Sequence, residues 1–150
     1  MSFAVRAATE ADAPALAQLE REARDALVEA RGGPQLLAEQ PEVGEWTALL
    51  ADRATRVWVA TIDDVVVVGY LQLALPAPGG AGVVRQVFVL DGARELGFGD
   101  WMLAEAITAT REAGGTVIES FALPGDRDTK NLYERAGVTA RKIIVSKRLG

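Results

Sequence analysis

The pattern of apolar and polar positions predicts a chain that alternates between strands and helices. Strands are indicated where β-branched and aromatic residues form short runs or alternate with polar ones, and helices where apolar residues recur every three or four positions. On this basis we expect strands over residues 3–7, 56–62, 65–75, 83–90, 116–123 and 141–148. We expect helices over residues 10–31, 97–113 and 129–136, with two shorter helical pieces within residues 34–53.

Local signals mark the ends of several of these elements. Thr9 and Asp12 have the spacing of a capping box, which predicts the start of the first long helix. The Gly-Gly-Pro run at 32–34 is expected to stop it. Two aspartates at 63–64 separate β-branched runs and predict a hairpin, in which Trp58 packs in the core or at a sheet edge.

The length of the chain and the order of these elements predict the number of domains and the type of sheet. A chain of 150 residues is expected to form a single domain over residues 1–150. Three strands between residues 56 and 90 follow one another without a helix, which predicts antiparallel neighbours, whereas the later strands alternate with helices. We therefore expect a mixed sheet with helices on both faces, an α/β or α+β fold.

Composition excludes several classes of chemistry. The chain has no cysteine and no histidine, so disulfides, thiolate or histidine metal sites, cysteine nucleophiles and Ser-His-Asp hydrolysis are excluded, and we expect no metal. A net charge of −5 argues against nucleic acid or an anionic membrane as the main partner. The sequence shows no signal peptide and no membrane span, so we expect a cytoplasmic protein.

The stretch from Val87 to Leu103 carries the most specific signal. A short apolar strand is followed by a turn, by the glycine-containing run Arg-Glu-Leu-Gly-Phe-Gly at 94–99, and by a helix. Two glycines allow a ligand to approach the backbone, and the first amides of a helix have no partner within it, so the corner is suited to a phosphate group. A dinucleotide fingerprint would need a third glycine at Met102, and a P-loop sequence is absent. The alternative is that the glycines only shape a tight corner.

Two segments resemble the GNAT N-acetyltransferase superfamily. The Arg-x-x-Gly-x-Gly spacing of residues 94–99, after a Val-x-Val strand, is similar to the acetyl-CoA motif of that family. Residues 131–138, NLYERAGV, resemble its late motif, in which a tyrosine lies on a short helix. The motifs occur in the family's order, and the resemblance covers nearly the whole chain. It implies the GNAT fold, a mixed and mostly antiparallel twisted sheet of about six or seven strands with helices on both faces.

The resemblance implies that acetyl-CoA binds as a co-substrate along the first motif. Backbone groups of the strand at 83–89 would receive the pantetheine arm, and the amide of Val89 or its neighbour would donate to the thioester oxygen. The amides from Leu96 to Gly99 would hold the pyrophosphate, and Arg94 is either an added charge or a solvated loop residue. The implied cofactor-binding residues are Val87, Phe88, Val89, Arg94, Glu95, Leu96, Gly97, Phe98, Gly99 and Asn131.

The catalytic residues follow from the same resemblance. Tyr133 is similar to the family's general acid, which protonates the departing thiolate; the alternative is a half-buried core tyrosine. Glu119 is the best carboxylate for the base, because it is the only acidic residue in its strand. Alternation places Glu119 on one face with Val117 and Phe121; if that face meets solvent rather than the acceptor cleft, Glu119 is an ordinary surface residue. Without cysteine, direct attack in a ternary complex is favoured over an acyl-enzyme.

Two departures from the family pattern leave a second hypothesis open. Asp126 stands seven residues before the tyrosine, where many relatives have Asn, and residues 83–90 contain no carboxylate. These features fit a non-catalytic acyl-CoA-binding or regulatory module with the same fold. The leading prediction is an acetyl-CoA-dependent N-acetyltransferase acting on a small-molecule or peptide amine, whose identity residues 31–53 do not reveal. A C-terminal strand at a sheet edge would allow a homodimer.

Overall fold

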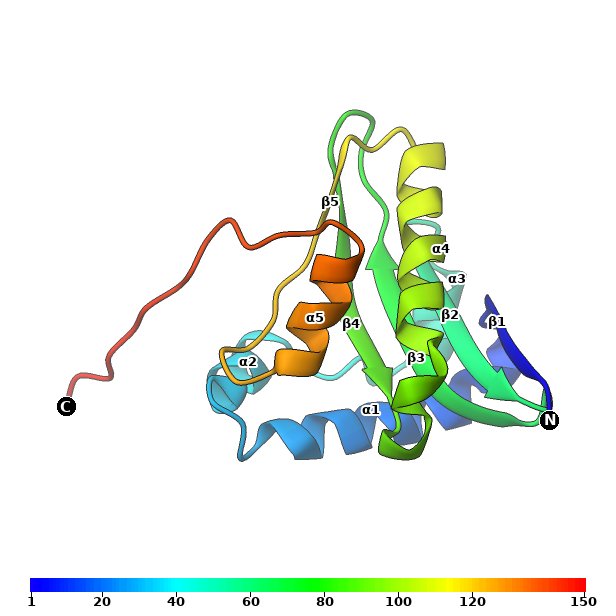
Figure 1. Ribbon diagram of the computed structural model, residues 1–150, viewed down its shortest axis with the longest axis horizontal. Coiled ribbons are helices and arrows are strands. Elements are labelled where there is room, and N and C mark those ends of the chain that lie inside the picture. The colour runs from blue at the N-terminus through cyan, green and yellow to red at the C-terminus, as the bar shows by residue number, and fades with distance from the viewer.

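The computed structural model describes all 150 residues and places one sheet between two groups of helices (Figure 1). In chain order the elements are β1 (Phe3–Ala7), the 3₁₀ turn η1 (Glu10–Asp12), α1 (Ala13–Leu27), α2 (Gly33–Glu39), α3 (Trp46–Ala51), β2 (Thr55–Ile62), β3 (Val66–Ala74), β4 (Ala81–Val89), the 3₁₀ turn η2 (Asp91–Leu96), α4 (Phe98–Glu112), β5 (Val117–Glu119) and α5 (Arg127–Arg135). The sheet order is β1-β2-β3-β4-β5, antiparallel except for the parallel pair of β4 and β5. The predicted mixed, mostly antiparallel sheet is confirmed.

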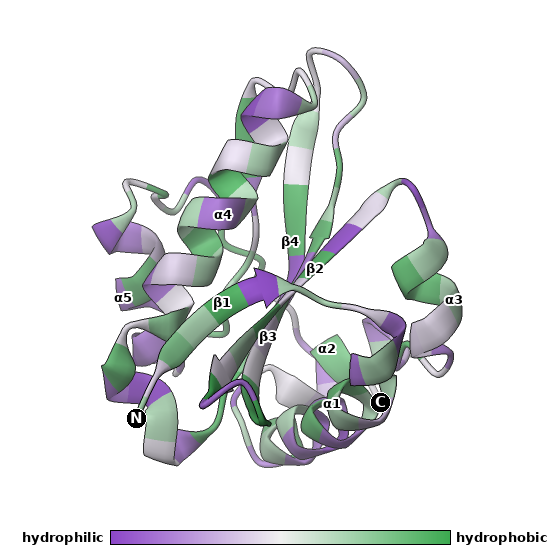
Figure 2. Cartoon of the chain, turned by 90° about the vertical axis from the view of Figure 1, so that its right-hand side faces the viewer, coloured by the Kyte–Doolittle hydropathy of each residue, from purple (hydrophilic) through white to green (hydrophobic).

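Each face of the sheet has its own hydrophobic core. Figure 2 shows α4 and α5 on one side of the strands and α1 to α3 on the other. The first core joins α4 and α5 to the sheet through Phe98, Met102, Leu103, Ala106, Leu132, Trp58, Leu71 and Leu73. The second core joins α1 and α3 to the sheet through Leu16, Leu19, Trp46, Val57, Val59 and Tyr70. Because both faces are covered, successive residues of β2 are buried although their side chains point in opposite directions.

The N-terminal helix begins as predicted but ends earlier. The capping box is present, with the Thr9 amide donating to the Asp12 carboxylate at 2.8 Å. α1 ends at Leu27, whereas its predicted end was residue 31. A Cβ atom at Gly33 would collide with the Leu27 carbonyl oxygen, so the chain folds back closely over the end of α1. The glycine run therefore follows the end of α1, and Gly33 allows α2 to pack closely against its last turn.

The predicted C-terminal strand is absent, and the sheet has five strands rather than six or seven. Residues 139–150 are exposed and irregular, and they leave the body of the molecule after α5 (Figure 1). A strand forms only when a neighbouring strand accepts its backbone hydrogen bonds, and these residues make none. β5 is likewise limited to three residues, where residues 116–123 were expected. None of the helices combines the length and the apolar character needed to cross a membrane.

Candidate active site

The two edges of β4 are paired to different extents. On one side β3 pairs with it from Val83 to Val89, but on the other side β5 pairs only from Ala81 to Val83. A bulge places Arg85 outside the register with β3, and a bulged strand bends. From Val84 to Val89, the backbone edge of β4 on the side of β5 therefore has no strand partner, and we call it the open edge.

This open edge forms one wall of a cleft of about 1250 Å³. The other walls are the η2–α4 corner, the segment after β5, α5, and parts of α1 and α2. Nine of the ten predicted cofactor residues line the cleft, namely Val87, Phe88, Val89, Arg94, Glu95, Leu96, Gly97, Gly99 and Asn131. Phe98 does not: its ring is 1% exposed and packs edge-on against Phe3, so only its backbone is available to a ligand. The structure thus brings the residues of both sequence motifs to one cleft.

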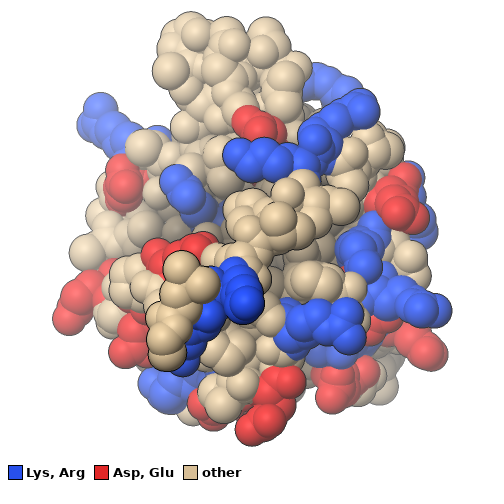
Figure 3. Space-filling view, turned by 90° about the vertical axis from the view of Figure 1, so that its left-hand side faces the viewer, with Lys and Arg blue, Asp and Glu red and all other residues tan.

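The charges along the cleft balance. Its lining contains Arg24, Arg31, Arg85, Arg94 and Arg135, and also Asp91, Glu95, Asp100, Asp126 and Asp128. Figure 3 shows basic and acidic side chains interspersed on the side of the molecule toward which the C-terminal segment projects. The lining therefore offers cations to an anionic ligand but has no excess of positive charge.

The glycine corner has the backbone geometry of an anion site. Gly97 has a φ of +84°, a left-handed conformation that a residue with a Cβ atom adopts only with strain. The first hydrogen bond of α4 runs from the Trp101 amide to the Gly97 carbonyl at 3.1 Å, so the amides before Trp101 have no acceptor four residues back in this helix. Those amides lie at the positive end of a helix dipole.

Arg94 is held by protein groups. Its Nε donates to the Val89 carbonyl at 3.0 Å, and Nη1 lies 2.8 Å from Asp91 and 3.7 Å from Asp128. The side chain therefore ties the end of β4 to η2 and to the start of α5. It remains 44% exposed in the cleft wall, so both predicted roles, an added charge and a loop residue, are compatible with its position.

Tyr133 reaches the place where β4 and β5 separate. Its hydroxyl lies 2.7 Å from Ser120 Oγ, and Ser120 Oγ donates to the Val84 carbonyl at 2.9 Å. Because the serine has one hydroxyl proton and the carbonyl can only accept, Tyr133 is the donor to Ser120. Burial raises the pKa of Tyr133, an effect opposed by the Ser120 hydrogen bond and reinforced by the charge of Asp126. The phenol is therefore protonated at neutral pH, as an acid must be.

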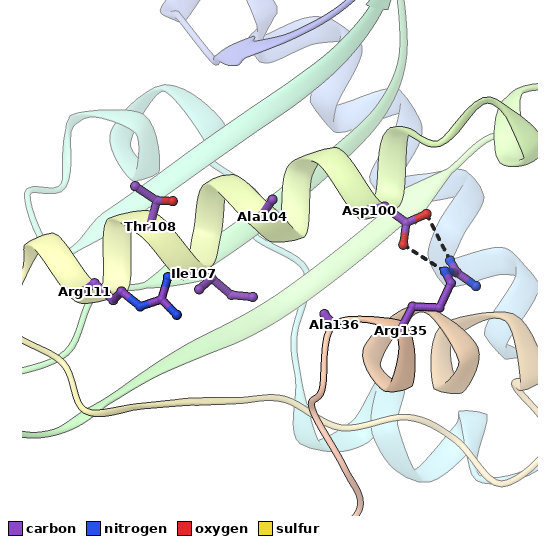
Figure 4. Close-up of a pocket in the computed structure, with 7 residues that line it drawn as sticks. All are labelled: Asp100, Ala104, Ile107, Thr108, Arg111, Arg135 and Ala136. Carbon is purple, nitrogen blue, oxygen red and sulfur yellow. Dashed lines mark hydrogen bonds and ion pairs between the residues drawn. The ribbon is translucent and has the colours of Figure 1, made fainter.

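Two contacts fix the helix that carries Tyr133. Asp126 caps α5 by accepting hydrogen bonds from the Thr129 amide at 3.0 Å and the Thr129 hydroxyl at 2.6 Å. At the other end Arg135 makes a two-pronged ion pair with Asp100 of α4, at 2.9 and 3.2 Å (Figure 4). The departure at Asp126 thus has a structural explanation, because this residue serves as the N-cap.

Glu119 occupies a different place. It is exposed at the end of β5 and does not line the cleft, whereas its neighbour Ser120 points toward Tyr133. The two alternatives for Glu119 were a position facing the acceptor cleft and a position facing solvent, and its exposure agrees with the second. The role of Glu119 as the base stays a prediction that its position does not favour.

A buried polar network that the sequence did not reveal reaches the cleft through Gln86 and Tyr70. Glu20 of α1 is 3% exposed, and its carboxylate accepts hydrogen bonds from the Val43 amide at 3.1 and 3.2 Å and from Gln86 Nε2 at 2.8 Å. Gln86 Nε2 also donates to Gln72 Oε1 at 3.0 Å, and the Tyr70 hydroxyl donates to Gln86 Oε1 at 2.6 Å. Glu20 forms no ion pair within the chain.

This network fixes the orientation of the Gln86 amide. A carboxylate only accepts, so Nε2 must face Glu20, and both of its hydrogens are then engaged. Oε1 faces Tyr70 and keeps one lone pair, and Gln86 lines the cleft. Burial and the negative charge of Glu20 raise the pKa of Tyr70, so Tyr70 stays a hydroxyl donor. A clue was present in the sequence: Glu20 follows Leu16 by four residues, on the apolar face of the helix.

Comparison with known proteins identifies the family of the chain. The family model of the Acetyltransferase (GNAT) family matches residues 16–138. No curated protein sequence matches the chain.

Solved structures share the fold. A mutant protein from Bacillus halodurans has a TM-score of 0.80 at 16% identity, covering 97% of this chain and 99% of that one. The ribosomal-protein-alanine N-acetyltransferase from Brucella melitensis has a TM-score of 0.67 at 21% identity over 100% and 99%. The aminoglycoside N-acetyltransferase AAC(6')-Iy in complex with CoA has a TM-score of 0.70 at 15% identity over 97% and 100%.

The chain belongs to the GNAT acetyltransferase family. Acetyl-CoA is the acyl donor of that family, so the predicted donor and the prediction of an acyltransferase are confirmed.

Proposed function

We propose that the protein is an N-acetyltransferase, which moves the acetyl group of acetyl-CoA to a primary amine by direct attack in a ternary complex. The observation that carries the proposal is a single cleft that joins the open edge of β4, the Gly97 corner and Tyr133. With neither cysteine nor histidine in the chain, no side chain is suited to carry a thioester-linked or imidazole-linked acetyl group.

The residues of the donor wall fit the parts of coenzyme A. Peptide groups of Val84 to Val89 along the open edge of β4 match the amides of a pantetheine arm, as in strand addition. The corner amides after Gly97 match a diphosphate, with Arg94 close by. The coenzyme supplies the activated acetyl thioester, and this wall orients it.

Tyr133 serves as the general acid in this proposal. When the amine nitrogen bonds to the acetyl carbon, the carbon–sulfur bond breaks, and the sulfur leaves as a thiolate that needs a proton. The raised pKa of Tyr133 keeps a proton on its hydroxyl, and Ser120 holds that hydroxyl at the mouth of the gap between β4 and β5. The proton that the amine loses passes to water in the cleft.

The network of Glu20 and Gln86 supplies the acceptor side. Gln86 Oε1 has a free lone pair, and the amide is polarised because its NH₂ group donates to a carboxylate. Glu20 is buried and forms no ion pair in the chain. A cationic group bound in the cleft beside Gln86 would therefore be attracted to its carboxylate. We therefore propose that Gln86 binds an N–H group of the acceptor and that Glu20 positions Gln86.

The test is the rate of thiol release from acetyl-CoA with a panel of amines, beside calorimetric titration with CoA. The panel includes aminoglycosides, polyamines, amino acids and peptides with a free N-terminus. The proposal predicts that CoA binds and that at least one amine accelerates thiol release above the rate in water. CoA binding with no acceleration by any amine would favour the non-catalytic acyl-CoA-binding module. No binding of CoA would contradict both.

A further inference from the structure

The charged residues of the cleft are segregated along its length. The end built from η2, α4 and α5 contains two arginines and five acidic residues, namely Asp91, Glu95, Asp100, Asp126 and Asp128. Both arginines are paired there, Arg94 with Asp91 and Arg135 with Asp100. The other end, built from α1, the loop after it and the bulge of β4, is lined by three arginines and no acidic residue: Arg24, Arg31 and Arg85. None of these three forms an ion pair within the chain, and we call this region the acceptor end.

The bulge of β4 turns Arg85 to the same face of the sheet as Gln86. Val84 and Val87 both pack in the core beneath α4 and α5, and side chains alternate along a strand. Arg85 follows the first valine and Gln86 precedes the second, so both residues point to the opposite face, where Gln86 reaches Glu20 of α1. The exposed guanidinium of Arg85 therefore lies in the cleft wall beside the amide that is proposed to bind the acceptor.

Arg24 adds a second guanidinium, which backbone groups hold in place. Its Nη1 donates to the Gln40 carbonyl at 2.6 Å and its Nη2 to the Leu37 carbonyl at 3.4 Å. A guanidinium has five N–H donors, so Arg24 keeps others for a ligand. Burial raises the pKa of Tyr70 and the charge of Arg24 opposes this effect, so Arg24 lies within electrostatic reach of the hydroxyl that donates to Gln86.

Glu20 does not neutralise the acceptor end. It is one carboxylate beside three guanidinium groups, it is 3% exposed, and it already accepts hydrogen bonds from the Val43 amide and from Gln86. It attracts the amine of an acceptor toward Gln86, while the arginines attract an anionic group of the same molecule. The acceptor end therefore suits a molecule that carries both charges.

The phosphates of the coenzyme do not account for Arg85. In the proposed complex the diphosphate lies at the corner after Gly97, whereas the thioester lies near Tyr133, which a serine hydroxyl links to the Val84 carbonyl. Arg85 is four residues from Val89, the last residue of β4 before that corner, and four strand residues span about 13 Å. Arg85 is therefore at the acetyl end of the coenzyme.

The rest of the acceptor end is apolar. Aliphatic residues of α1 and α2 face an aromatic residue of the segment after β5 across the cleft, and they include Ala23, Ala26, Leu27, Ala30, Leu36 and Phe121. The loop after α1 meets that segment, since a Cβ atom on Gly32 would lie 3.4 Å from Leu123 Cδ2. Such a lining binds hydrocarbon groups and leaves the few polar groups to set the orientation of the ligand.

Resting on the proposed function, we propose that the acetyl acceptor is an amino acid with an apolar side chain, whose carboxylate Arg85 binds. The planar fork of an arginine matches a carboxylate with two parallel hydrogen bonds. Gln86 receives the amine, Arg24 adds a second donor to the carboxylate, and the aliphatic wall of α1 receives the side chain. The nitrogen bonds to the acetyl carbon as the carbon–sulfur bond breaks, and the products are the N-acetyl amino acid and CoA.

Two matched pairs of acceptors test the proposal: leucine with leucinamide, and phenylalanine with phenylalaninamide. The members of a pair share the side chain and differ in the carboxylate, and the amides have the more readily deprotonated amine. In assays of thiol release from acetyl-CoA, kcat/KM for the amino acid should exceed that for its amide about tenfold or more, as expected for a charged hydrogen-bonded pair. Amides that are equal or better acceptors would overturn the proposal and leave acetyl transfer itself standing.

Variants assign the preference to Arg85. Arg85→Gln removes the charge of an exposed side chain, so the preference for the amino acid should fall to about twofold or less, through a higher KM. Arg85→Lys keeps the charge but not the fork and should retain part of the preference. The matched control Arg21→Gln removes an exposed arginine of α1 outside the cleft and should leave the preference unchanged. A full preference in Arg85→Gln, or an equal loss in Arg21→Gln, would contradict the role of Arg85.

Calorimetric titration of leucine into the complex with CoA separates this inference from the proposed function. Leucine should bind, and Arg85→Gln should weaken its binding about tenfold while the affinity for CoA stays within about twofold. Leucine binding that depends on Arg85, without thiol release, would support the carboxylate site and contradict acetyl transfer. No binding of leucine or phenylalanine would overturn the carboxylate site, whichever other amines are acetylated.

Discussion

The two walls of the cleft are built from different chemical groups. The proposed donor wall consists of the open β4 edge and the corner after Gly97, and it offers peptide N–H and C=O groups. The proposed acceptor wall consists of the side chains of Gln86 and Tyr70, from β4 and β3, and Glu20 of α1 lies buried behind them.

The difference separates binding of the coenzyme from choice of the amine. A backbone wall has nearly the same groups whatever its side chains are, so it suits a ligand that all members of a family share. A side-chain wall changes with every substitution, so it suits the ligand that distinguishes one member from another. Tyr133 lies where the walls meet, and its substitution should therefore affect turnover rather than binding of either ligand.

The largest effect is expected from Tyr133→Phe. This change removes the acid and keeps the ring in the core, so the turnover number should fall by about 100-fold or more. The affinity for CoA, measured by calorimetry, should stay within about twofold. Equal turnover in the two proteins would remove Tyr133 as the acid.

A smaller loss is expected from Gly97→Ala, on the donor wall. The added Cβ atom meets no neighbour, but a left-handed φ of +84° costs a residue other than glycine about 1–2 kcal/mol. The corner should relax, and the dissociation constant of CoA should rise about tenfold, since 1.4 kcal/mol corresponds to a factor of ten. Gly79→Ala is the control: it also has a positive φ, of +77°, and no neighbour, but it lies outside the cleft and should leave CoA binding unchanged.

Glu20→Gln tests the acceptor wall. The new side-chain amide can donate a hydrogen bond where the carboxylate only accepted one. The Gln86 amide should therefore flip and present its NH₂ group instead of its oxygen to the substrate amine. The KM for the amine should rise about tenfold, in keeping with the roughly 1.5–3 kcal/mol of a hydrogen bond to a charged group, while the affinity for CoA stays the same. Glu22→Gln on the exposed face of α1 should change neither constant. An equal loss of CoA binding in Glu20→Gln would show that the two walls are not separate.

The pH dependence of turnover tests the environment of Tyr133. Burial raises the pKa of its phenol, so the protonated acid persists above the ordinary tyrosine value of about 10. Turnover at saturating amine should therefore not decline through loss of this proton below pH 10. In the unfolded chain this phenol ionises at the ordinary tyrosine pKa of about 10, below its pKa in the folded protein. The contribution of Tyr133 to the free energy of unfolding should therefore decrease only above pH 10. An alkaline limb that begins near pH 8 would place another group in the role.

The smallest effect is expected from Glu119→Gln. The side chain is exposed and lies outside the cleft, so turnover should stay within about twofold of wild type. A fall of tenfold or more at unchanged stability would restore Glu119 as the base, and β5 would then have to turn its outer face toward the cleft.

The sequence predicted the donor wall far better than the acceptor wall, and the reason is physical. The groups from Val84 to Gly99 are contiguous, so a strand followed by a glycine corner determines their positions through local geometry. Glu20 and Gln86 are 66 positions apart, and only the packing of α1 on the sheet brings them together. The C-terminal strand was predicted from a β-branched pattern, but a strand also needs a neighbouring strand, and residues 139–150 form no backbone hydrogen bonds in the structure.

The central claim is that peptide groups of one strand edge and one glycine corner hold coenzyme A with its sulfur beside Tyr133. A crystal structure of the complex with CoA tests it most directly. The account predicts the diphosphate on the amides that follow Gly97, the pantetheine arm along Val84 to Val89, and the sulfur within hydrogen-bonding reach of the Tyr133 hydroxyl. A coenzyme bound elsewhere, or a sulfur far from that hydroxyl, would contradict the account.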